Sequence, residues 1–273
     1  MWPLEPELRV RPILEGSLLP EFSISGRDFA FISGPGSAWT AVNERPLPDD
    51  WDWGEAVGMS PAEIRLYAGL LLSEPNPWEN GQLTLVPGPL FVDAVGADLS
   101  LPEVQAQLSQ RIDTHFAETD LRRAGEVNVG VGSAKEALRV YDQIDADDQL
   151  LLAGLGRFVQ AQRLLVTGWL EDAALPLFIA MGASFEFIRL WLEEQRGSAS
   201  MDDVYEYIDH NLPEDREASE WFKWMYEERV VAVHPANRFG EFWTSPMMTG
   251  MIFELRKSLH SLYRHIITGD PLV

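Results

Sequence analysis

The stretch MTGMIFELRKSLHSLYRHI, residues 248–266, carries the clearest hydrophobic pattern in the chain. Its apolar residues recur at helical spacing: Met248, Met251, Ile252, Leu255, Leu259, Leu262 and Ile266. Residues at this spacing line one face of an α-helix, and that face is stable only when other elements cover it. The stretch therefore predicts a long amphipathic helix packed against other helices.

Similar stripes run back through the second half of the chain. Two further helices are predicted by Leu151, Leu155, Phe158, Gln162, Leu165 and Trp169, and by Leu177, Met181, Phe185, Ile188 and Leu192. Ser200 and Asp203 form the start of a shorter helix, which Asn211 and Pro213 close. We expect residues 144–273 to form an all-α antiparallel bundle.

The first 100 residues have a different pattern, rich in Pro, Gly and Trp with short strand-like runs. Phe22–Ile32 alternates apolar residues around a glycine, which indicates a hairpin or a bent strand. Gln82–Val95 indicates two short strands broken by Pro87–Pro89. Ser60–Glu63 supplies a cap, a first-turn proline and an acid for one helix. Residues 1–100 are thus predicted to form a small mixed α/β or β-rich module.

Residues 101–143 are predicted to be a helical connector between the module and the bundle. Leu101–Ala124 has helical character, and Gly125–Gly132 is read as a glycine-containing link. Ser133–Glu136 matches a capping box that starts another short helix. The fold class predicted for the whole chain is therefore α+β.

The composition narrows the function classes. The 273 residues include 43 Asp and Glu and 21 Lys and Arg, so the net charge is -22. This argues against a protein whose main task is to coat nucleic acid or an anionic membrane.

The chain has no cysteine, which excludes disulfides, Cys-ligated zinc and thiol nucleophiles. The longest uncharged apolar run, Ala173–Phe185, is shorter than the roughly 20 residues of a membrane span. We expect a soluble, cytoplasmic protein without a membrane partner.

Two groups of residues resemble metal sites but lack the required spacing. The aspartates between 142 and 148 lack the Gly and Glu of a calcium-binding EF-hand loop, so Asp147 or Asp148 is interpreted as a helix cap. His260 and His265 lie about 140° apart on a helix and cannot share a metal ion, so we interpret them as solvated or interface histidines. We predict no metal and no cofactor.

The segment WFKWMYEERVVAVHP, residues 221–235, carries the strongest chemical signal. Four apolar residues separate Arg229 from His234. Pro235 cannot continue a helix, so His234 is expected at a helix end, where it can face a cleft. Imidazole can take the proton from a ribose 2′-hydroxyl, or it can donate a proton to the leaving oxygen. Guanidinium can bind the phosphate and offset its developing charge.

Two other interpretations of this segment stay open. Arg229 can pair with a nearby acid such as Glu227 or with another helix. The β-branched run Val230–Val233 can also form a strand, in which case the helix-end geometry is lost.

The order of these elements resembles the HEPN superfamily, and within it the ApeA-like type of domain. A long helix (about 149–168) precedes a second one that contains FEFIRLW (185–191). The motif Tyr226-x-x-Arg229-x4-His234-Pro235 follows, then a loop (236–240) and a last helix ending near residue 269. The resemblance covers roughly residues 145–270.

The resemblance implies an up-and-down helical bundle that forms a homodimer, with two Arg–His motifs in one cleft. In catalytic members it implies metal-independent endoribonuclease activity, often in toxin–antitoxin or antiviral systems. Arg229 would orient the phosphate and His234 would act as general acid and base. The residues expected to bind substrate are Asn237, Arg238, Arg256 and Lys257. Implied partners are RNA and an antitoxin or regulatory protein, with no DNA expected.

Two alternatives remain. The chain can be a non-catalytic HEPN-like dimer that serves as a binding or scaffold protein, with its function in the N-terminal module. It can also be an unrelated helical interaction protein in which the motif is accidental.

Overall fold

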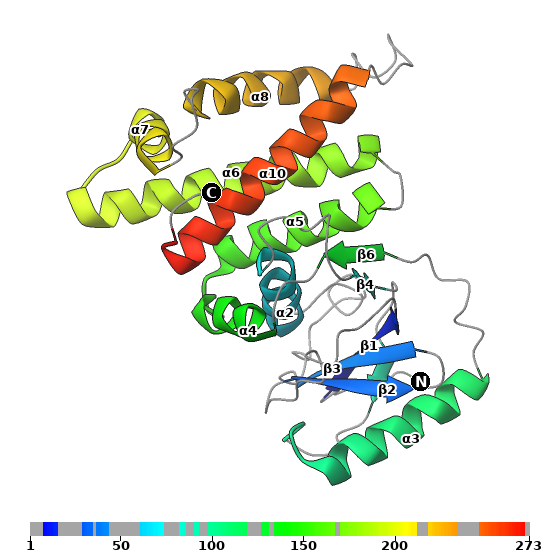
Figure 1. Ribbon diagram of the computed structural model, residues 1–273. Helices are drawn as coiled ribbons and strands as arrows, with labels where there is room; N and C mark the ends of the chain where they lie inside the picture. Colours follow the sequence, from blue (N-terminus) through cyan, green and yellow to red (C-terminus); the bar gives the residue numbers. More distant parts are fainter. Residues whose placement is uncertain are drawn as a thin grey trace, which may run out of the picture. The chain divides into compact units, whose positions relative to one another are not determined.

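The computed structural model describes residues 8–15, 29–34, 37–43, 61–73, 82–85, 90–92, 98–118, 127–130, 134–166, 170–211, 218–233 and 246–270 (Figure 1). These residues are mostly helical, in agreement with the predicted bundle. The chain divides into two compact units, residues 1–139 and 140–273, and each is described by itself.

Six strands of the first unit form one antiparallel sheet. They are β1 (Leu8–Glu15), β2 (Phe29–Gly34), β3 (Ser37–Asn43), β4 (Gln82–Leu85), β5 (Leu90–Val92) and β6 (Val127–Gly130). The order is β2-β3-β1-β4-β6, and β5 also pairs with β1. Ile13–Glu15 pairs with β4 and Leu8–Val10 pairs with β5, so the two short strands share one edge of β1.

The strands can be compared with three segments that the sequence predicted to be strands, a break or a link. The predicted break at Pro87–Pro89 lies between β4 and β5, where it separates two short strands. The strand within Phe22–Ile32 begins at Phe29, and Phe22 itself lies outside the described residues. The predicted link Gly125–Gly132 contains β6, which pairs with β4. The pairing comes from a distant segment, so local composition does not reveal it.

Helices α2 (Pro61–Leu72) and α3 (Pro102–Glu118) belong to the first unit. The helix α2 starts at the predicted first-turn proline, contacts β3 and β6, and is buried over almost its whole length. The helix α3 lies against β2. The N-terminal part of α3 follows a turn in which Asp98 accepts hydrogen bonds from the amide and hydroxyl of Ser100.

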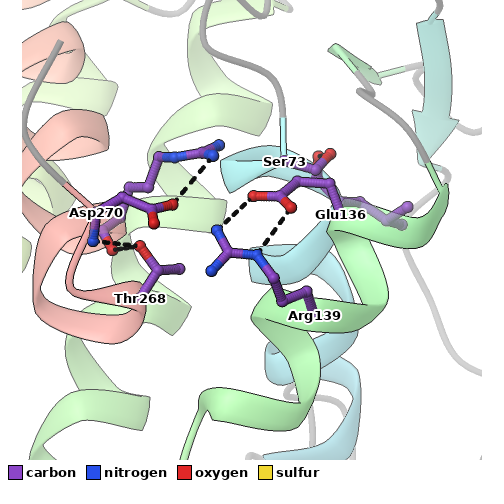
Figure 2. A network of polar contacts seen from close by, with 7 residues as sticks. Ser73, Glu136, Arg139, Thr268 and Asp270 are labelled. Carbon is purple, nitrogen blue, oxygen red and sulfur yellow. Dashed lines mark hydrogen bonds and ion pairs between the residues drawn. The ribbon is translucent and has the colours of Figure 1, made fainter.

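The division between the units falls inside α4 (Ala134–Gln143), between Arg139 and Val140. In the predicted capping box Glu136 would reach back to the start of this helix. Both oxygens of the Glu136 carboxylate accept hydrogen bonds from Arg139, one turn further on, at 2.8 and 2.7 Å (Figure 2). Ser133 lies outside the described residues.

The described helices of the second unit are α5 (Gln149–Val166), α6 (Leu170–Arg196), α7 (Met201–Asn211), α8 (Ala218–Val233) and α10 (Pro246–Thr268). The central helix is α6, which packs against each of the other four (Figure 1). Only three residues join α5 to α6, so the two helices run antiparallel. The buried apolar residues Phe158, Met181, Phe222 and Leu259 come from four different helices and mark the core.

Local polar contacts define the helix starts in this unit. The Asp148 carboxylate accepts a hydrogen bond from the amide of Leu151 at 2.9 Å, so Asp148 caps α5. Ser200 and Asp203 form the predicted reciprocal capping box before α7, with the Ser200 amide 2.7 Å from the Asp203 carboxylate. Both helices therefore begin where their side chains predict.

The helix α6, with 27 residues, is the longest of the described helices. Over Asp172–Arg196 it has the length and composition of a membrane-spanning helix, and it is the one such helix in the described part of the chain. In this structure 56% of its most apolar stretch is buried within the protein. Packing in the bundle therefore accounts for much of its apolar composition.

Candidate functional site

The helix α8 positions the first residue of the predicted catalytic pair. Its N-terminus is held by Asp209 of α7, whose two carboxylate oxygens accept hydrogen bonds from the amide and hydroxyl of Ser219, at 2.8 and 2.6 Å. Further along, Phe222 and Met225 are buried. The ring of Phe222 meets that of Phe185 of α6 edge to face, with centroids 5.3 Å apart. Two buried anchors and a capped start thus hold α8 against α6.

The residues Val230–Val233 are helical, so the interpretation of this run as a strand is wrong. Arg229 lies within the helix, one turn beyond Met225 in sequence, and its side chain is outside the described part of the chain. The helix ends at Val233, one residue before His234. His234, Asn237 and Arg238 lie outside the described residues.

Arg256 lies in the interior of the bundle. Its side chain is 1% exposed, and its Nε donates a hydrogen bond to Oε1 of Gln162 on α5. Burial lowers the pKa of the Arg256 guanidinium to about 9, because the interior disfavours its charged form. This environment does not favour a substrate contact. Lys257, the next residue along α10, is exposed.

Of the two interpretations of these histidines, solvated or interface, the solvated one is wrong for His260. His260 is buried, with 4% of its surface exposed. His265 is half-buried and both of its ring nitrogens have hydrogen-bond partners.

His265 and its hydrogen-bond partners form a polar cluster in the described part of the bundle. Its Nε2 is 2.9 Å from the hydroxyl of Tyr207, and its Nδ1 is 2.8 Å from the main-chain oxygen of Asp270. The Tyr207 ring also lies 5.6 Å, centroid to centroid, from Trp191, whose side chain is exposed. Burial raises the pKa of the Tyr207 hydroxyl above its ordinary value. The cluster joins α6, α7 and the end of α10.

The turn after α10 is held by further contacts. The guanidinium of Arg264 pairs with the Asp270 carboxylate at 3.3 Å, and the Asp270 amide donates to the Thr268 hydroxyl at 3.1 Å (Figure 2). Gly269 has a positive φ of 67°, which a residue without a side chain adopts at little cost, and its amide donates to the oxygen of His265. The Asp270 carbonyl is thereby fixed next to the imidazole.

Within the described ranges, no group of three or more His, Asp or Glu side chains is arranged to hold a metal ion. No family model matches the chain, and neither a curated protein nor a solved structure matches it. Assignment to the HEPN superfamily therefore rests on the motif residues and on the order of the helices.

Sequence reasoning missed the buried Arg256–Gln162 pair and the His265 cluster. A signal for the first was present, because Gln162 falls on the apolar stripe of α5 and Arg256 lies one turn from Ile252. No local signal pairs His265 with Tyr207, since 58 positions separate them.

Proposed function

We propose that this protein is a HEPN-like, metal-independent endoribonuclease of the toxin or antiviral-defence type. Arg229 and His234 are its catalytic residues. The observation that carries the proposal is the course of α8, which is helical through Arg229 and ends at Val233. That course supports a motif in which the arginine lies within the helix and the histidine follows its end.

The proposed reaction needs only these two side chains. Neutral imidazole of one His234 takes the proton of the 2′-hydroxyl, and the oxygen attacks the adjacent phosphorus. The bond from phosphorus to the 5′-oxygen breaks, and that oxygen receives a proton, from an imidazolium or from water. Arg229 stabilises the charge on the phosphate oxygens. The products are a 2′,3′-cyclic phosphate and a 5′-hydroxyl end.

The proposed assembly is a homodimer formed through the α-helical bundle, in which two motifs share one cleft. Because the chain carries a net charge of -22, RNA has to be attracted locally. Arg229, Arg238 and the exposed Lys257 are the proposed source of that attraction, with Asn237 as a polar contact. The N-terminal part, proposed to be a mixed α/β module in an α+β chain, would restrain the activity or sense a trigger. The proposed location is the cytoplasm.

A second candidate is a non-catalytic HEPN-like dimer that binds or organises other macromolecules. The burial of Arg256 favours it, because this burial removes one cation from the predicted RNA-binding set. The acidic surface also favours a protein partner over RNA.

The test is incubation of the purified full-length protein with end-labelled RNA in EDTA. We expect cleavage with cyclic-phosphate ends, and a loss of roughly 10²-fold or more in Arg229→Ala and in His234→Ala. His210→Gln is the matched control, because His210 is exposed on α7 and should leave cleavage unchanged. No cleavage by a dimeric wild-type protein would support the scaffold function. Equal cleavage by all variants would indicate a contaminating nuclease.

A further inference from the structure

The imidazole of His265 bridges two segments that are distant in sequence. On one side its Nε2 is 2.9 Å from the hydroxyl of Tyr207 in α7. On the other its Nδ1 is 2.8 Å from the main-chain oxygen of Asp270, in the turn after α10.

The partners determine where the protons are. A carbonyl oxygen can only accept a hydrogen bond, so Nδ1 of His265 must carry a hydrogen. In a neutral imidazole the other nitrogen is then a bare acceptor. Tyr207 therefore donates its hydroxyl hydrogen to Nε2. The geometry selects one of the two neutral tautomers.

The Asp270 carbonyl does not turn away readily, because the turn is tied to α10 at several points. The Gly269 amide donates to the His265 oxygen at 2.8 Å, and the Asp270 amide donates to the Thr268 hydroxyl. The Arg264 guanidinium holds the carboxylate of Asp270 at 3.3 Å. Nδ1 thus keeps its hydrogen whether or not Nε2 is protonated.

We propose that His265 is a protonation-dependent polarity switch between α7 and α10. When Nε2 takes up a proton, it becomes a donor, and the Tyr207 oxygen becomes the acceptor. The link between the helices is kept, but the Tyr207 hydroxyl hydrogen is released to find another partner. After the switch, the Tyr207 hydroxyl can donate its hydrogen to another acceptor near the exposed ring of Trp191. The bundle itself does not open.

The charged and titratable groups at this cluster come from three segments. They are Tyr207 from α7, Arg264 from α10 and the Asp270 carboxylate from the turn, while α6 contributes the uncharged ring of Trp191. Arg264 and Asp270 pair with one another at 3.3 Å.

The test is a pH series of nitrogen-detected NMR spectra on full-length protein labelled at histidine and tyrosine. At high pH we expect His265 with hydrogen on Nδ1 and a bare Nε2. His210, exposed on α7, is the internal reference and should show the averaged signals of a solvated imidazole. His265→Gln and His210→Gln assign the two sets of signals.

As the pH falls, the signal of the Tyr207 ring carbon that bears the hydroxyl should shift with the same midpoint as His265. Amide hydrogen exchange of α7 should stay unchanged through that transition. A hydrogen on Nε2 at high pH, a Tyr207 signal that does not follow His265, or fast exchange of α7 at low pH would each overturn the proposal. The pH series itself is recorded on the wild-type chain, and the two variants serve only to assign its histidine signals.

Discussion

Arg256 of α10 donates a hydrogen bond from its Nε to the side-chain oxygen of Gln162 on α5, within the interior of the bundle. Both side chains are almost fully buried, at 1% and 2% exposed. A charge in this place is tolerated only while polar groups replace the water it has lost. The pair therefore couples the two helices.

The first prediction concerns this pair. Gln162→Leu removes the acceptor and leaves a charge in the interior, so the free energy of unfolding should fall by about 3 kcal/mol. Arg256→Met leaves the neutral amide of Gln162 without the guanidinium donor. It should lower the free energy of unfolding by about 1–3 kcal/mol. The double variant should be more stable than Gln162→Leu alone. Urea unfolding measures all three.

Lys257→Met is the matched control, because Lys257 is exposed beside Arg256, and its change should stay within about 0.5 kcal/mol. Losses that simply add in the double variant would contradict the coupling of Arg256 to Gln162.

The second prediction concerns close packing between α5 and α6. A Cβ built on Gly154 would lie 2.9 Å from the Cβ of Ala183 and also crowd the Tyr263 hydroxyl. Gly154→Ala should therefore destabilise the fold by about 1–3 kcal/mol, because neighbouring groups must shift. Thermal unfolding measures the effect.

Gly182 on α6 is the matched control, since a Cβ there meets no atom within 4 Å. Gly182→Ala should raise the stability by up to about 1 kcal/mol, because alanine favours the helix. The reverse order of the two variants would show that α5 and α6 are not packed as described.

The third prediction is a dependence of stability on alkaline pH. Tyr263 is fully buried, its hydroxyl donates to the Ala180 oxygen at 2.7 Å, and burial raises its pKa well above the ordinary value of 10. Above pH 10 the unfolded chain loses this proton while the folded chain keeps it. Deprotonation then favours the unfolded state, so the stability contributed by neutral Tyr263 falls as the pH rises further.

The measurement compares urea unfolding of wild type and Tyr263→Phe between pH 8 and pH 11. At pH 8 the variant should be less stable by about 1 kcal/mol, the value of a typical hydrogen bond. Above pH 10 the difference should shrink. Tyr226→Phe, at an exposed tyrosine, is the control variant. A constant difference between Tyr263→Phe and wild type would count against a buried phenol.

The fourth prediction concerns the start of α8. Asp209→Ala removes both acceptors of Ser219, so it should cost about 1–2 kcal/mol, as for the loss of a helix cap. Faster amide hydrogen exchange should appear at the N-terminal end of α8. Glu206→Ala, at an exposed position on α7, is the control and should change little. Similar exchange in both variants would show that Asp209 does not hold α8.

Much of the bundle follows from the sequence, because its signals are local. The carboxylate of Asp148 and the Ser200–Asp203 pair mark helix starts through atoms within three residues of them. Leu255, Leu259 and Leu262 are all buried, as the period of their stripe predicts. The course of the motif helix also follows from the sequence, since Pro235 limits it and the structure ends α8 at Val233.

The polar residues of the interior could not be assigned in this way. Arg256 and His260 are buried although they lie off the apolar stripe of α10 and their types are common on surfaces. Their burial depends on acceptors supplied by other helices, and Gln162 lies 94 positions away. The strand β6 shows the same limit, because only its pairing with β4 distinguishes it from a link.

The sequence by itself determined the helix starts, the apolar stripes and the helical course of the segment that contains Arg229. Only the tertiary structure decided which polar side chains are buried and which groups they contact. The reason is physical. Helix signals arise from hydrogen bonds and periodicity within a few turns, whereas the environments of Arg256 and His265 are made by groups that only folding brings close.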